Sequence, residues 1–162
     1  MVVESKPVDL STLDLAYLGQ FLGMRVNQLV KEGLQSAGFA NVRESHGYVI
    51  QHLIESERSI TELAARMEVT QQAASKVVAE LSRLGIVEIL AAADRRVKIV
   101  RLSERGAEAV QLGRQARKRI ERRLIQALGS ESYELAKSIL SLGLETLGGI
   151  ERIRSRRVQP PE

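Results

Sequence analysis

Apolar residues recur at spacings of three to four along most of the chain, which predicts a mainly helical protein. The pattern that follows Ser11 predicts one long amphipathic helix ending near Gly33, and Ser11 with Asp14 resembles an N-terminal capping box. A loop at residues 37–44 separates it from a second helical stretch at 45–54.

Two short helical patterns then stand back to back, after a polar turn at residues 55–59. The first runs from Ile60 to Met67, and the second runs from about Thr70 to Leu84 and ends at Gly85. This spacing predicts a helix-turn-helix, in which Ala64 is small because the second helix crosses the first closely there.

Beyond Gly85 the hydrophobic period shortens from helical to strand-like. Residues 86–90 and 97–102 are rich in β-branched side chains and flank the charged segment 91–96, so they predict a β-hairpin. A capping Ser103 then begins a helix to about Leu128, and a last helix is predicted at 131–153. We therefore expect a mostly α (α+β) fold built around a winged helix-turn-helix.

Composition narrows the chemistry. The chain has no Cys, which excludes disulfides, thiolate catalysis and Cys-ligated zinc. Its two histidines, His46 and His52, are six residues apart and would face different sides of a helix, so we expect no metal site and no cofactor. No apolar stretch approaches 18 residues, and no phosphate loop or nucleophile motif is present. We expect a cytoplasmic protein, without membrane association and without enzymatic activity. An active site formed by paired carboxylates in a cleft stays open as an alternative.

Charge is distributed unevenly along the chain. Residues 1–57 carry 4 Lys and Arg against 7 Asp and Glu, whereas residues 58–105 carry 9 against 6 and residues 106–162 carry 11 against 7. The calculated pI of about 9.7 suits a polyanionic partner, and a solubilising surface explains it equally well.

The second short helix has a polar face at its N-terminal end, where recognition helices meet base edges. Gln bonds adenine, Ser and Thr bond several bases, and Lys suits a phosphate, so double-stranded DNA is the predicted partner. The alternative is an ordinary solvated face. The residues of this face are Thr70, Gln71, Gln72, Ser75 and Lys76.

Three segments of the sequence resemble the MarR family of bacterial transcription regulators: residues 60–64, 81–87 and 94–106. The resemblance implies a homodimeric repressor of a palindromic operator, released by a small aromatic or phenolic ligand. It implies a dimerisation region at 1–44 and 107–162 and a DNA-binding domain at 45–106, with a recognition helix at about 70–84 and a wing at about 86–102. It also matches Arg96 to the wing arginine that enters the minor groove, Asp94 to the acidic partner that orients this arginine, and Arg95 to a phosphate contact, so all three belong to the expected DNA-binding site.

Two features depart from the family pattern. The segment Ala91-Ala92-Ala93 replaces a more basic wing loop, which predicts a weaker wing contact with DNA. Glu68 stands in the inter-helix turn, where a positive φ is unfavourable for Glu, so a local difference in the turn is expected.

A ligand pocket is expected at the junction of the two regions, because pockets favour such junctions. The candidate residues there are Tyr17, Met24, Arg25, His46 and Tyr48. A core role for these side chains is the simpler interpretation, and a winged helix that binds protein and not DNA is the alternative function.

Overall fold

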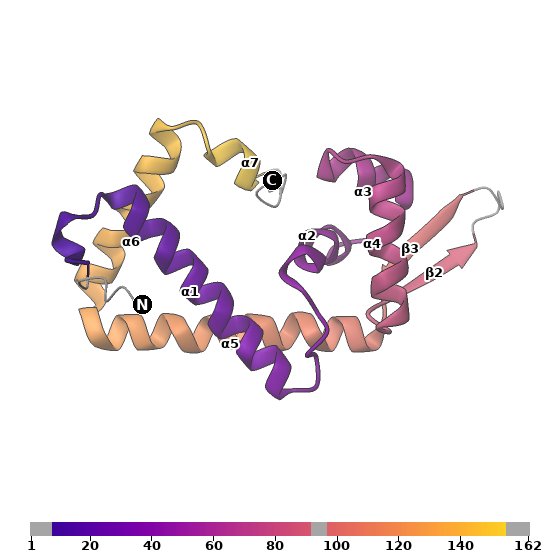
Figure 1. Cartoon of the computed structure of the whole chain (residues 1–162), viewed down its shortest axis with the longest axis horizontal. Coiled ribbons are helices and arrows are strands. Elements are labelled where there is room, and N and C mark those ends of the chain that lie inside the picture. Colours follow the sequence, from indigo (N-terminus) through magenta and orange to yellow (C-terminus); the bar gives the residue numbers. More distant parts are fainter. Residues whose placement is uncertain (1–7, 92–96, 155–162) are drawn as a thin grey trace, which may run out of the picture.

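The computed structural model describes residues 8–91 and 97–154. They form a mainly helical chain with a small sheet (Figure 1). In chain order, the elements are η1 (Leu10–Thr12), α1 (Leu15–Ser36), α2 (Glu44–Leu53), β1 (Arg58–Ser59), α3 (Ile60–Met67), α4 (Gln71–Arg83), β2 (Val87–Ala91), β3 (Lys98–Leu102), α5 (Glu104–Leu128), α6 (Ser130–Thr146) and α7 (Ile150–Arg154).

The long helix α5 joins two parts of the molecule. As Figure 1 shows, its first turns lie beneath α2, α4 and the sheet, whereas its last turns lie beneath α1 and lead into α6 and α7. Helix α1 crosses α5 closely at Gly33, where an added Cβ would lie 3.6 Å from the Cβ of Ala116. Small residues on both helices allow this approach.

The sheet has three strands in the order β1-β3-β2, all antiparallel. Strands β2 and β3 form the predicted hairpin, with Val87 opposite Leu102 and Ala91 opposite Lys98. The short strand β1 adds to the free edge of β3, with Arg58 opposite Val100. The hairpin prediction is thus confirmed, and the third strand was missed.

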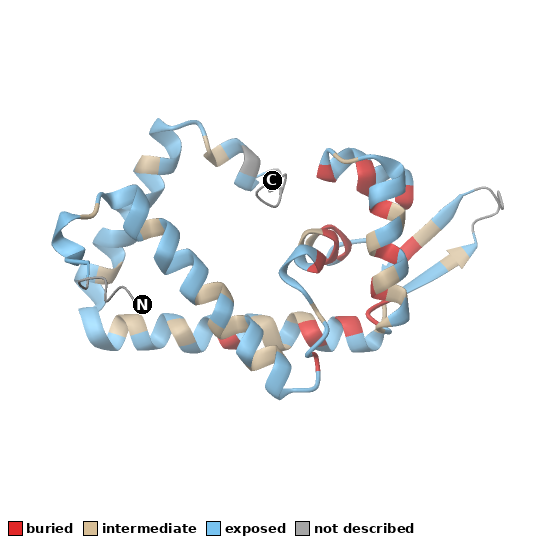
Figure 2. Ribbon diagram, in the orientation of Figure 1, coloured by how far each residue is buried: buried red, intermediate tan, exposed pale blue. Residues whose placement is uncertain are grey.

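The buried core lies in the part of the molecule that contains α2, α3, α4 and the sheet (Figure 2). Leu63, Ala74, Val78, Leu81 and Val100 are completely inaccessible to solvent. These residues come from the helix-turn-helix and the sheet, and their spacing along α3 and α4 is the one that the sequence pattern predicts. By contrast, no residue of the described helices α1 and α6 is buried.

Local caps fix where most helices begin. The hydroxyl of Ser103 accepts a hydrogen bond from the Gly106 backbone at 3.0 Å and donates one to the Gly85 carbonyl, so it caps α5 and holds the end of α4. Gly85 has φ +70°, the left-handed conformation that favours glycine after a helix. Both assignments were predicted from the sequence.

Two helix boundaries differ from prediction. Asp14, and not Ser11, caps α1, because its carboxylate accepts from the Tyr17 backbone at 2.8 Å, while Ser11 lies in η1. The predicted last helix is divided into α6 and α7 at Gly148, whose φ of +75° ends α6. In the described segments, no helix has the length and apolarity needed to cross a bilayer.

Candidate nucleic-acid interface

Helix α4 presents its N-terminal turn to solvent. Thr70 stands at its N-cap with extended backbone angles, and its hydroxyl accepts from the Ala73 backbone at 3.1 Å. Behind this turn, Ala74, Val78 and Leu81 are buried against the core. The buried stripe fixes the rotation of α4, so its opposite face points away from the protein.

The predicted polar residues share that outward face. Thr70, Gln71, Gln72 and Lys76 are exposed, and Ser75 is half-buried. Together with Ala73, four of them surround a shallow hollow at the start of α4; these four are Thr70, Gln72, Ser75 and Lys76. The sequence interpretation did not include Ala73, whose exposed methyl group suits the methyl group of thymine.

A second hollow, a groove of about 480 Å³, separates α4 from the sheet. Gln71 and Ser75 line it from α4, Thr61 lines it from α3 and Lys98 lines it from β3. Polar residues of α4 and of β3 thus meet around one depression. Thr61 and Lys98 were missed by the sequence interpretation, because the groove brings together segments that are distant along the chain.

The tip of the hairpin lies at residues 92–96, outside the described part of the chain. The predicted DNA contacts of Asp94, Arg95 and Arg96 therefore stay predictions. The adjoining strands are held by an ion pair between Arg101 and Glu88 at 2.8 Å, on opposite residues of β3 and β2.

The turn between α3 and α4 has a left-handed residue at the position that the sequence analysis singled out. Glu68 has φ 55° and ψ 37°, and its backbone N–H points to the carbonyls of Ala64 and Ala65. The expectation of a locally altered turn is wrong: the turn keeps its left-handed geometry, and Glu68 adopts it despite its Cβ.

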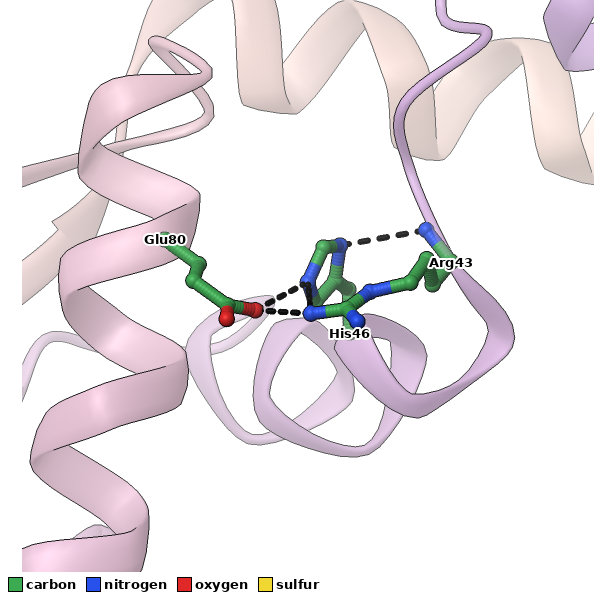
Figure 3. A network of polar contacts seen from close by, with 3 residues as sticks. All are labelled: Arg43, His46 and Glu80. Atoms are coloured by element: carbon green, nitrogen blue, oxygen red, sulfur yellow. Dashed lines mark hydrogen bonds and ion pairs between the residues drawn. The ribbon is translucent and has the colours of Figure 1, made fainter.

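Glu80 connects α4 with the first turn of α2 and its N-cap. Its carboxylate accepts from Nε2 of His46, 3.3 Å away, and from the guanidinium of Arg43 (Figure 3). His46 is 1% exposed, and its Nδ1 accepts from the Arg43 backbone N–H at 3.1 Å. The imidazole therefore carries its proton on Nε2 when neutral. The hydrogen bond from His46, followed by the contacts of Arg43, lowers the pKa of Glu80.

A cavity of about 540 Å³ lies between α1, α2 and α5. Leu34, Val42, Ile50, Ile54 and Val110 contribute apolar walls. Four cations also line it, and Glu44 is the one carboxylate among the lining residues. The four cations are Lys31, Arg43, Arg114 and Arg117.

The five residues predicted for a ligand pocket are not brought together in one place. Met24 lines the cavity, whereas Tyr17 packs against Phe21 with ring centroids 5.2 Å apart. Arg25 pairs with Glu32 at 3.3 Å. His46 bonds Glu80, and the half-buried Tyr48 packs against the core. The cavity is thus near the predicted junction but has a mostly different lining.

No group of three or more His, Asp or Glu side chains suited to a metal ion is found in the described residues. The polar groups near α4 are instead suited to hydrogen bonds and ion pairs.

The sequence of residues 40–97 matches the model of the MarR family. No curated protein matches the sequence. Three solved structures illustrate the likeness in fold. The YusO protein from Bacillus subtilis is 22% identical with a TM-score of 0.68, over 86% of this chain and 99% of that one.

The second is a mutant of MepR from Staphylococcus aureus bound to an oligodeoxyribonucleotide. It is 19% identical with a TM-score of 0.63, over 83% of this chain and 99% of that one. The third is MarR from E. coli in its apo form, 19% identical with a TM-score of 0.62, over 82% of this chain and 97% of that one. These likenesses show a shared fold along nearly the whole of each structure.

Proposed function

We propose that this chain is a DNA-binding transcription regulator of the MarR family, whose model matches residues 40–97 and whose winged-helix fold it shares. The observation that carries the proposal is the exposed N-terminal turn of α4, with Thr70, Gln71, Gln72 and Lys76 on its outward face. A MepR mutant with the same fold is bound to an oligodeoxyribonucleotide. We assign sequence recognition to the glutamines and a phosphate contact to Lys76.

Selection from random double-stranded DNA at physiological ionic strength tests this function. We expect a two-fold symmetric site, bound at least about a thousand times more tightly than unrelated DNA. Gln72→Ala should weaken binding about tenfold. Gln111→Ala, an exposed glutamine on α5, is the matched control and should have no effect. Binding without sequence preference would favour the alternative, a winged helix that binds protein.

We further propose that the chain acts as a homodimer through α1 and α6. In the single chain, no residue of the described helices α1 and α6 is buried. Large apolar side chains on both helices are exposed, and clustered apolar surface without a partner marks an association site. The exposed apolar residues of α6 are Leu135, Ile139, Leu140, Leu142 and Leu144.

Light scattering measures the molar mass of the protein in solution and therefore its oligomeric state. The wild-type protein should have twice the mass of one chain. Leu142→Glu places a charge on a residue that is 64% exposed in the single chain, and should shift the protein towards the monomer. Gln111→Glu adds the same charge at an exposed site near the winged helix and should leave the dimer intact.

We propose that the protein is a repressor. We also propose that a small organic anion binds in the cavity between α1, α2 and α5 and releases the protein from DNA. The apolar walls suit an aromatic ring, and the surrounding cations suit a carboxylate or phenolate. A thermal-shift comparison of benzoate with benzyl alcohol separates the contribution of the aromatic ring from that of the negative charge. We expect stabilisation by benzoate in the wild type, and less stabilisation in Arg114→Gln.

We propose that the wing adds a contact through Arg96. In a narrow minor groove the negative potential attracts an arginine. If Arg96 enters that groove, Arg96→Ala will weaken binding and lower the salt dependence by about one charge equivalent. An unchanged salt slope would exclude a phosphate-like contact at this residue.

A further inference from the structure

The first turn of α2 makes contacts with two other helices. Arg43 and His46 bond Glu80 on α4 (Figure 3). Between them, Glu44 accepts a hydrogen bond at 2.7 Å from the side-chain amide of Asn27 on α1. A displacement of this turn would therefore change its contacts with both the recognition helix α4 and α1.

The same turn forms part of the cavity wall. Arg43, Glu44 and Gly47 all line the cavity. The carboxylate of Glu44 is bonded to Asn27, whose carbonyl oxygen in turn accepts from Arg117 at 3.3 Å. The lining thus has more positive than negative charge, and its one carboxylate is already engaged.

The two side chains that bond Glu80, those of His46 and Arg43, differ in mobility. The side chain of His46 is 2% exposed and is fixed by its second bond, to the Arg43 backbone. The Arg43 side chain is 61% exposed, so its guanidinium can change partners at small cost. An anion in the cavity offers Arg43 a competing partner, and arginine forms strong paired hydrogen bonds with carboxylates.

We propose that Arg43 is the residue through which an anion in the cavity acts on the recognition helix. With the cavity empty, Arg43 and His46 together hold Glu80 and the C-terminal half of α4. A bound anion draws the guanidinium towards itself, and Glu80 then keeps only its bond with His46, so that the C-terminal half of α4 is held less firmly on the core. This inference rests on the proposed function, since a looser α4 matters only if α4 reads DNA. The expected coupling is about fivefold or more in affinity for the operator.

Hydrogen exchange of the α4 amides in the full chain tests the coupling without DNA. Benzoate at millimolar concentration serves as the anion. In the wild type, benzoate should speed exchange in α4. In Arg43→Gln, α4 should exchange faster from the start and should no longer respond to benzoate. Arg114→Gln is the matched control, because Arg114 also lines the cavity but does so from α5. It should bind benzoate less tightly, leave α4 unchanged without benzoate, and keep the response at saturation.

Glu80→Gln provides a second route to the same pair. It should reproduce the fast exchange of α4. The new amide oxygen can still accept from His46, so both changes remove the same ion pair, and the double variant with Arg43→Gln should be no faster than either single one. Wild-type exchange that ignores benzoate would overturn the proposal, as would an equal response in Arg43→Gln. A protein with this coupling but no DNA preference would instead contradict the proposed function, so the two failures are distinguishable.

Discussion

The backbone of Gly106 packs directly against the carbonyl of Ile86, so closely that a Cβ on Gly106 would overlap the carbonyl oxygen. Gly106 is in the first turn of α5, and Ile86 precedes β2. The backbone N–H of Ser103 also donates to the Ile86 carbonyl, at 3.0 Å. This contact explains why the block that begins with the cap Ser103 needs a glycine three residues later.

Gly106→Ala should therefore lower the free energy of unfolding, by about 1–3 kcal/mol, because the added methyl group must push helix and strand apart. Gly113→Ala on the same helix is the control, since an added Cβ there meets no atom within 4 Å. It should raise stability by up to about 1 kcal/mol through helix propensity. Urea unfolding at one fixed protein concentration measures both. Equal effects of the two changes would contradict the assigned contact.

Replacing Glu68 by Gly should stabilise the protein by about 1 kcal/mol. A residue with a Cβ is strained in the left-handed conformation, and the φ of 55° at Glu68 requires that conformation. Ala65→Gly, at an exposed position inside α3, should have the opposite sign and a similar size. Thermal unfolding of the two variants provides the comparison, and a loss of stability in Glu68→Gly would show that its side chain outweighs the strain.

The cap that Thr70 forms and its proposed contact with DNA can be separated by substitution. Thr70→Ala removes the acceptor for the Ala73 backbone and should cost about 1 kcal/mol of stability. Thr70→Asp restores an acceptor at the N-cap and should keep the stability. Its charge would repel phosphates, so its affinity for DNA should fall well below that of the wild type. Full DNA affinity in Thr70→Asp would place Thr70 away from the DNA backbone.

Acid should weaken the cap of α3 through Glu62. The backbone N–H of Ser59 donates to its carboxylate at 2.7 Å, and this bond, followed by that from the Ser59 hydroxyl, lowers the pKa of Glu62. A carboxyl group with a lowered folded-state pKa stabilises the fold above its ordinary value of about 4.3. That contribution disappears as pH falls through the lower folded-state pKa.

Glu62→Gln keeps a side chain that can accept the same bond but does not titrate. The variant should lose less stability than the wild type between about pH 5 and pH 3. Parallel denaturation curves over this range measure the difference. Identical acid profiles would mean that the Glu62 bond is not formed in solution.

Several parts of the fold follow from short-range signals in the sequence. The periods of α3, α4, β2 and β3, the caps Thr70 and Ser103, and the glycine at position 85 act within a few residues, so the pattern is sufficient to locate them. The outward face of α4 follows for the same reason, because its buried stripe is visible in the sequence. The two glycines at 148 and 149 were also a local signal, and the prediction of one unbroken last helix overlooked it.

Other features depend on segments that meet only after folding. The strand β1 exists because β3 offers it an edge, and two residues are too few to carry a recognisable pattern. Nothing local marks the bond between His46 and Glu80, 34 residues apart, or the position of Arg105 over the ring of Phe39, 4.6 Å from its centroid. The lining of the cavity is likewise set by how α1, α2 and α5 cross. The sequence by itself determined a helix-turn-helix with an exposed polar face, because caps and periodicity are local. The tertiary structure decided what holds that helix from behind, because packing brings together side chains that no sequence spacing relates.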